Sequence, residues 1–231
     1  MNYISHEHEC SLFNGYILNR VAANIGKRNG VTLMSQSNAK DRSLRLFVAV
    51  PLTRPIANEL QEWTHAHREK LPFRKWTHPD DYHITLQFLG ETPAGKMDAL
   101  QAALMGIKER DLALALNGAG TFGPPTAPRI LWAAVSGHLE GLSSLQSAVT
   151  KATISCGFKA EDRPYTPHIT VARGFAGTGA IPAEVMANAP SGLQWRADRF
   201  VLMRTHMQTS PMYEVIGEYP LHPLSDQSDN R

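Results

Sequence analysis

Two segments of the chain carry the same short motif, a histidine followed two residues later by a threonine. His83 precedes Thr85 and His168 precedes Thr170, and an isoleucine stands between the two in both cases. With 10 histidines and 15 threonines among 231 residues, chance alone gives roughly two-thirds of one such motif. The shared isoleucine and the strand-like alternation around both motifs make the repeat informative. It predicts two matched sites, one in each half of the chain.

The alternation of residue types determines which side chains share a face. In a β-strand, residues two apart point to the same side of the sheet. We therefore expect the first motif to place polar residues on one face and apolar residues on the other: His83, Thr85 and Gln87 against Ile84, Leu86 and Phe88. If a pseudo-twofold axis relates the halves, two imidazoles and two hydroxyls line one groove.

A groove lined in this way suits a phosphodiester substrate. Two imidazoles with unperturbed pKa values near ~6.5 can be held in opposite protonation states, so that one protonates a leaving oxygen while the other takes a proton from the attacking group. The threonine hydroxyls can donate hydrogen bonds to non-bridging phosphate oxygens. This chemistry requires neither a metal ion nor a covalent nucleophile, and we expect no cofactor.

Strand and helix patterns alternate along the chain from residue 44 onwards. The predicted strands cover residues 44–50, 82–89, 112–116, 130–135, 167–172, 200–204 and 213–219, and the last two form a hairpin. Apolar stripes at steps of three and four predict helices near residues 56–67, 97–107 and 142–156. A Gly/Pro-rich stretch at residues 117–128 is interpreted as the joint between two similar α+β halves.

Length and composition describe an ordinary globular chain. Of 231 residues, 42% are apolar and 19% charged, and the net charge of +2 argues against a protein that coats duplex nucleic acid. The two cysteines match no zinc or redox spacing, and the polar N-terminus is unlike a secretory signal, so we expect a cytoplasmic protein. We expect a poorly packed extension at residues 1–43, a domain at 44–224 and a loose tail at 225–231.

Beyond this chemistry, the sequence resembles the 2H phosphoesterase superfamily, and within it the bacterial RNA 2′,3′-cyclic phosphodiesterases, formerly called 2′-5′ RNA ligases. The similarity extends over about residues 44–221. It rests on four stretches of sequence: LFVAVP at residues 46–51, WTHPDDYHITLQFLGE at 76–91, PRILW at 128–132 and YTPHITVAR at 165–173.

The resemblance implies a fold, an activity and a role for each residue. It implies a bilobal α+β fold with two similar lobes, an antiparallel sheet and helices in each, and an active groove between them. His83 would be the proton donor to the leaving 3′ oxygen, His168 the proton acceptor that activates water, and Thr85 and Thr170 the phosphate ligands. The implied partner is an RNA or oligonucleotide end with a 2′,3′-cyclic phosphate, converted to a 2′-phosphomonoester. We expect a monomer with no protein partner and no contact with a membrane.

Other interpretations stay open. The same groove could run the reverse reaction and act as a 2′-5′ RNA ligase, or the repeat could only grip phosphate in a non-catalytic RNA-end binding protein. Tyr165 is a possible substrate contact, since Tyr165, Phe88 and Trp132 could each stack on a base, although aromatic residues on strands usually belong to the core. Arg173 has the opposite parity to His168, so it can contact the substrate only if the strand ends or twists at Ala172. The stretch at residues 78–83 resembles loose metal spacing but lacks the further ligands of a metallophosphodiesterase, so we expect no metal.

Overall fold

A computed structural model describes residues 43–223, so the predicted extension up to residue 42 and the predicted tail lie outside the described residues. The strands are β1 (Ser43–Pro51), β2 (Phe73–Trp76), β3 (His83–Pro93), β4 (Leu112–Phe122), β5 (Ile130–Gly137), β6 (His168–Phe175), β7 (Ser191–Ala197), β8 (Arg199–Thr205) and β9 (Tyr213–Pro220). The α-helices are α1 (Arg54–His67), α2 (Met97–Met105), α3 (Leu139–Ser155) and α4 (Ala183–Ala187). Three short 3-10 turns are η1 (Arg68–Lys70), η2 (Pro79–Asp81) and η3 (Ala94–Lys96).

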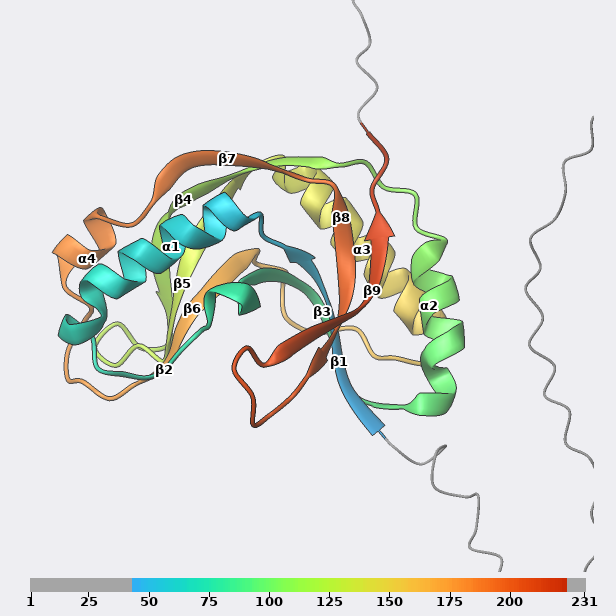
Figure 1. Cartoon of the computed structure of the whole chain (residues 1–231), viewed down its shortest axis with the longest axis horizontal. Coiled ribbons are helices and arrows are strands. Elements are labelled where there is room, and N and C mark those ends of the chain that lie inside the picture. Colours follow the sequence, from blue (N-terminus) through green and yellow to red (C-terminus); the bar gives the residue numbers. More distant parts are fainter. Residues whose placement is uncertain (1–42, 224–231) are drawn as a thin grey trace, which may run out of the picture. The chain divides into compact units, whose positions relative to one another are not determined.

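All of the strands belong to one curled sheet (Figure 1). Eight follow the order β7-β4-β5-β6-β3-β1-β8-β9, while β2 pairs with β6 beside that path, and the pairings are antiparallel. The order is symmetric about its centre, where β3 leads into β1, β8 and β9 and β6 leads into β5, β4 and β7. The predicted α+β fold with two similar antiparallel lobes is thus confirmed, with the lobes as halves of a continuous sheet.

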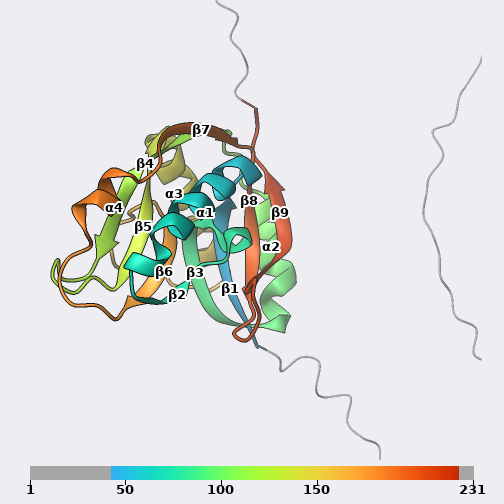
Figure 2. The same ribbon diagram turned by 60° about the vertical axis from the view of Figure 1, so that its left-hand side comes forward.

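The helices are exchanged between the halves (Figures 1 and 2). Helix α1 follows β1 of the first half, but it lies over β4, β5 and β6, and its Trp63 indole donates a hydrogen bond to the Val185 carbonyl of α4. Helix α3 follows β5 of the second half, but its Thr153 hydroxyl donates to the Gln87 side chain of β3 at 2.6 Å. Each half of the sheet is therefore covered by a helix that begins in the other half, which ties the two halves together.

The predicted joint at residues 117–128 is wrong. Strand β4 continues to Phe122, and the rest of that stretch is the turn between β4 and β5. The strand continues through its glycines because a register shift between Leu116 and Ala119 and a left-handed Gly118 (φ 80°) absorb the irregularity. The chain instead enters the second half just before β4 and returns to the first half at β8, so the first half contains both early and late strands.

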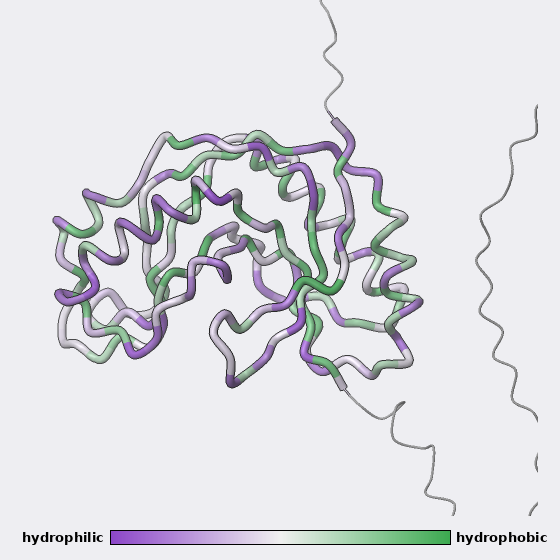
Figure 3. The backbone as a smooth tube through the Cα atoms, in the orientation of Figure 1, coloured by the Kyte–Doolittle hydropathy of each residue, from purple (hydrophilic) through white to green (hydrophobic). Residues whose placement is uncertain are grey.

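Apolar residues concentrate in the strands, and polar residues dominate the loops (Figure 3). One large buried cluster runs through both halves of the sheet and the helices that cover it. A second, small cluster consists of Phe47, Ala49, Val201 and Met203, with Tyr213 packed against it. It supports the strand face on which His83 lies, because Phe47 and Tyr213 both contact the His83 ring.

Candidate active site

The two histidines meet where the halves of the sheet join. His83 is the first residue of β3 and His168 the first of β6, and the isoleucines at the centres of the two motifs are bridge partners. Extending this antiparallel register by one residue places His83 opposite Thr170 and Thr85 opposite His168. The pseudo-twofold axis therefore passes between the isoleucines, and each motif contributes a histidine and a threonine on either side of this bridge. Of these four residues, His83 and Thr170 line the cavity described below, so the prediction that all four line one groove is met only in part.

A β-bulge changes which residues of the first motif face the groove. Along β1, Ala49 is opposite Thr85 but Val48 is opposite Gln87, so Leu86 is an extra residue. After the bulge Gln87 is only 2% exposed and Phe88 is 54% exposed. The predicted placement of Gln87 beside His83, and of Phe88 in the apolar layer, is therefore wrong, because one extra residue reverses the alternation.

The second motif has a bulge at the equivalent position. Thr170 is opposite Trp132 and Ala172 is opposite Leu131, which leaves Val171 as the extra residue. Val171 and Ala172 are both fully buried. Arg173 consequently turns to the groove side, where it lines a cavity together with Thr170 and His83. The bulge at Val171, one residue before Ala172, supplies the twist that brings Arg173 to this side.

Both imidazoles are held in the same orientation by the backbone. His83 Nδ1 lies 2.7 Å from the Asp81 carbonyl oxygen, and His168 Nδ1 lies 2.8 Å from that of Thr166. A carbonyl oxygen only accepts hydrogen bonds, so Nδ1 carries the hydrogen in each ring and Nε2 is left for chemistry. The Thr85 hydroxyl lies 3.1 Å from His83 Nε2 and donates to it when that nitrogen is unprotonated.

The surroundings of the two rings differ. The ring of His83 packs against Phe47 at 4.8 Å and meets Tyr213 edge-on at 5.2 Å between centroids. Burial lowers the pKa of His83 to about 4, the bond to the Asp81 carbonyl opposes this shift, and the positive charges of Arg173 and His168 add to it. Without a bound anion, His83 is therefore neutral at pH 7.

His168 lies in a more open place. Its ring meets Phe122 edge-on at 4.9 Å and lies 6.1 Å from Trp132, both on strands of the second half. Burial lowers its pKa too, against the effect of its bond to the Thr166 carbonyl, and the charge of Arg173 contributes. This shift is smaller than that of His83, so proton affinity differs between two rings that the repeat makes equivalent.

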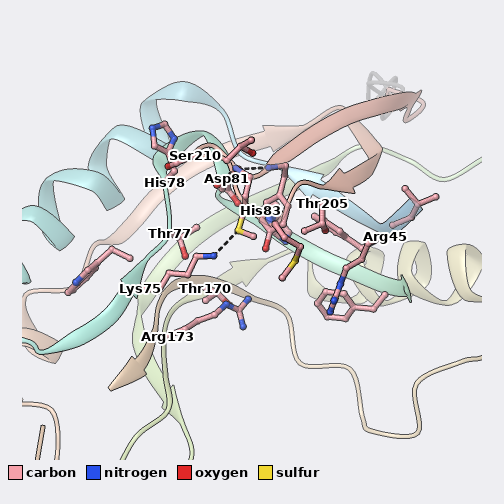
Figure 4. Close-up of a pocket in the computed structure, with 18 of the residues that line it drawn as sticks. Arg45, Lys75, Thr77, His78, Asp81, His83, Thr170, Arg173, Thr205 and Ser210 are labelled. Carbon is pink, nitrogen blue, oxygen red and sulfur yellow. Dashed lines mark hydrogen bonds between the residues drawn. The ribbon is translucent and has the colours of Figure 1, made fainter. Parts of the chain in front are cut away.

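Three cations line a cavity of about 450 Å³ beside His83 (Figure 4). Lys75 and Arg173 are direct cross-strand partners on β2 and β6, and Arg45 lies on β1 toward the other end of the cavity. Like charges directly opposite each other in a sheet are unfavourable. In residues 43–223, no carboxylate lies within salt-bridge distance of any of the three. An anion bound in the cavity would relieve this repulsion.

Comparison with known proteins gives the family. The model of the LigT-like phosphoesterase family matches residues 50–132 and 134–213, so each matched segment contains one motif. The chain belongs to this family. An RNA 2′,3′-cyclic phosphodiesterase of Geobacillus stearothermophilus is 40% identical over 178 residues, which are 76% of this chain but only 56% of that protein. The protein of the same name from Bacillus subtilis (strain 168) is 34% identical over 182 residues, which are 76% of this chain and 95% of that protein.

Solved structures of LigT-like proteins have the same fold. The structure of Escherichia coli LigT complexed with 3′-AMP aligns with a TM-score of 0.67 at 25% identity, over 78% of this chain and 98% of that one. A protein of Thermus thermophilus aligns with a TM-score of 0.63 at 26% identity, over 78% of this chain and all of the other. These alignments agree with the two-lobed sheet and with the resemblance found in the sequence.

The LigT-like site also contains a brace that the sequence did not reveal. The Asp81 carboxylate, 3% exposed, accepts hydrogen bonds from the backbone N–H groups of Met212 (2.9 Å) and Tyr213 (3.0 Å). The carbonyl of the same Asp81 orients His83, so one residue joins the imidazole to the loop between β8 and β9 (Figure 4). Lys75 Nζ lies 3.2 Å from Met212 Sδ and contacts this loop from β2.

Other predicted features lie away from this cavity. Tyr165 is half-buried against the main core, its hydroxyl has no hydrogen-bond partner among residues 43–223, and burial raises its pKa. It is not among the residues that line the cavity. Within residues 43–223, no group of three or more His, Cys, Asp or Glu side chains is arranged to hold a metal ion. In the same residues, no helix is long and apolar enough to cross a membrane.

Proposed function

We propose that this LigT-like phosphoesterase hydrolyses 2′,3′-cyclic phosphate ends of RNA to 2′-phosphomonoesters by proton transfer between His83 and His168. The names of the relatives at 40% and 34% identity support the substrate class. The observation that carries the mechanism is the arrangement of the two imidazoles, which are anchored through Nδ1 to backbone carbonyls on either side of a single strand bridge. This leaves two Nε2 atoms for one phosphorus centre.

His168 has the features of a general base. Its Nδ1–H is engaged with the Thr166 carbonyl, its Nε2 carries a lone pair in the neutral ring, and it is the more open of the two histidines. In the proposed step, His168 Nε2 takes a proton from water while the water oxygen bonds to phosphorus. The bond from phosphorus to the ribose 3′ oxygen breaks, and that oxygen takes the proton from His83 Nε2.

His83 must be protonated to donate a proton to the leaving oxygen, and binding of the substrate favours this protonated form. The phosphodiester is an anion, and its charge beside His83 and Arg173 raises the pKa of the imidazole that burial has lowered. The Thr85 hydroxyl, which lies 3.1 Å from Nε2, then turns its hydrogen to a phosphate oxygen, with Thr170 doing the same from β6. Arg173 binds the non-bridging oxygens, and its guanidinium is suited to bidentate contact.

The proposal is tested by turnover of an RNA dinucleotide that ends in a 2′,3′-cyclic phosphate, in the presence of EDTA, with the product read by phosphorus NMR. We expect a 2′-phosphomonoester and no effect of the chelator. Loss of activity in EDTA would indicate a metallophosphodiesterase. A joined product in the presence of 5′-hydroxyl RNA would indicate a 2′-5′ RNA ligase, and binding without turnover over hours would indicate an RNA-end binding protein.

A further inference from the structure

The cavity breaks the twofold symmetry of the site. His83, Thr170 and Arg173 line its wall, whereas His168 and Thr85 are not among the lining residues. The loop between β8 and β9 contributes Met207, Thr209 and Ser210, and the Asp81 carboxylate holds that loop at Met212. The repeat alone would place equal space beside both histidines, so the presence of this cavity beside His83 indicates which way a substrate lies.

In-line displacement at phosphorus relates this asymmetry to the orientation of the bound substrate. The attacking water and the departing oxygen occupy opposite apices, so they lie next to different histidines. In a 2′,3′-cyclic phosphate the departing oxygen belongs to the terminal ribose. If His83 is the proton donor, as the proposed function requires, that ribose lies on the His83 side, where the cavity is.

We propose that this cavity binds the terminal nucleoside of the RNA, with its base stacked on Phe88 and the phosphate that precedes it bound by Arg45. This inference rests on the proposed function. It adds a binding mode to that function, in which the substrate is at least a dinucleotide and the RNA strand runs from His83 toward the Arg45 end of the cavity (Figure 4).

Phe88 has the properties of a stacking platform. The bulge at Leu86 turns its ring out of the apolar layer, and the side chain is 54% exposed in the cavity wall. Phe47 supports it from below at 6.0 Å between ring centroids. Phe88 stands five residues after His83, which is the place that Arg173 takes after His168. One half therefore presents a cation for the reacting phosphate, and the other presents an aromatic face for a base.

Arg45 is placed for the next phosphate along the strand. It is exposed on β1, and its neighbours Leu46 and Phe47 are opposite Gly90 and Phe88 of β3. Lys75 and Arg173 lie together on the side of the cavity near Thr170, while Arg45 lies apart from them (Figure 4). A terminal nucleotide held between these two positions has its own phosphate at the Arg173 end. The preceding phosphate is then at the Arg45 end.

The test measures binding of two products by calorimetry: a nucleoside 2′-monophosphate, and a dinucleotide with the same 2′-phosphate end. Phe88→Ala should weaken binding of both products about tenfold through lost stacking, and Phe88→Trp should keep most of the affinity. Arg45→Gln should weaken the dinucleotide several-fold more than the mononucleotide. Leu193→Ala, which removes another exposed apolar side chain (38%) on β7, is the matched control.

Equal affinity of Phe88→Ala and the wild type for the mononucleotide would overturn the stacking site. Equal weakening of both products by Arg45→Gln would overturn the assignment of the preceding phosphate. Because these measurements need no turnover, they test the binding mode independently of the proposed hydrolysis. If binding of the products depends on Phe88 but the wild-type protein does not hydrolyse the 2′,3′-cyclic dinucleotide, the proposed function is refuted and the binding mode stands.

Discussion

His83 and His168 begin equivalent strands, but their surroundings differ. His83 lies between Phe47 and Tyr213, beside the cavity and its cations, and burial lowers its pKa to about 4. His168 lies near Phe122 and Trp132 in a more open place, and its pKa is lowered less. A duplicated backbone thus gives two identical anchors for the rings, while the side chains around each ring determine which proton it holds. In the proposed mechanism, the two identical anchors position the phosphate, and the different surroundings of the rings assign the donor and acceptor roles.

The largest expected effects come from the histidines themselves. His83→Ala and His168→Ala should each lower kcat/KM for a cyclic dinucleotide at least ~100-fold. An aryl phosphodiester such as bis(4-nitrophenyl) phosphate separates their roles, because its leaving group departs without a proton. On that substrate His83→Ala should lose much less activity than His168→Ala. The measurement is the ratio of the two kcat/KM losses, and His65→Ala, at an exposed position of α1, serves as the control.

Equal losses for the two variants on the aryl substrate would mean that the assignment of donor and acceptor is wrong. Losses in the reverse order would exchange the roles, which the low pKa of His83 in the free protein would then explain directly.

The repeat in the sequence is enough to predict that the two motifs begin matching strands, and the structure brings them together at the bridge between Ile84 and Ile169. His83, Thr85, His168 and Thr170 follow from a local rule, since strand alternation holds over three residues whatever the rest of the fold does. The rule fails immediately afterwards, because a bulge follows each threonine and reverses the faces of the next residues. The residue types do not indicate a bulge. Strand alternation alone therefore predicts that Phe88 lies in the apolar layer, and it lets Arg173 contact the substrate only if the strand twists.

Contacts between residues that are distant in the sequence cannot be predicted from local sequence patterns. The Asp81 carboxylate accepts a hydrogen bond from the backbone N–H of Met212, 131 positions away, whereas the sequence shows only an acidic residue in a turn. The exchange of α1 and α3 between the halves likewise depends on packing, not periodicity. The apolar stripes of these helices predicted the helices themselves, but they do not specify which half of the sheet each helix covers.

In the described part of the chain, the Asp81 brace has no equivalent in the second half, and it gives a smaller, more specific prediction. Its counterpart Thr166 is exposed, and among residues 43–223 it holds its histidine through the backbone carbonyl without a side-chain brace. Asp81→Asn puts an amide N–H where the carboxylate accepted bonds from Met212 and Tyr213, so the loop and the Tyr213 ring should loosen around His83. We expect kcat to fall about tenfold and the alkaline limb of the kcat–pH profile, which reports the proton donor, to move to higher pH, because the burial that lowers the His83 pKa decreases.

The matched control is Asp80→Asn, one residue away, where the carboxylate is exposed and paired with Arg54. It should leave both the rate and the pH profile close to wild type. A fall in thermal stability of Asp81→Asn with an unchanged pH profile would show that the brace only supports the fold.

The smallest expected effect is on stability, and it compares the two rings without any substrate. The pKa of His83 is about 4 in the folded protein and near the ordinary 6.5 in the unfolded chain. Between these values the unfolded chain binds a proton that the folded protein does not, so the free energy of unfolding should decrease as pH falls from about 6.5 to 4. For a half-buried ring the loss should be about 1–3 kcal/mol.

Urea denaturation at several pH values measures this effect. The free energy of unfolding should depend less steeply on pH in His83→Ala than in His168→Ala, because the pKa of His168 is lowered less. If both variants kept the wild-type slope, the carboxylates alone would set the acid stability and the electrostatic difference between the rings would lose its support.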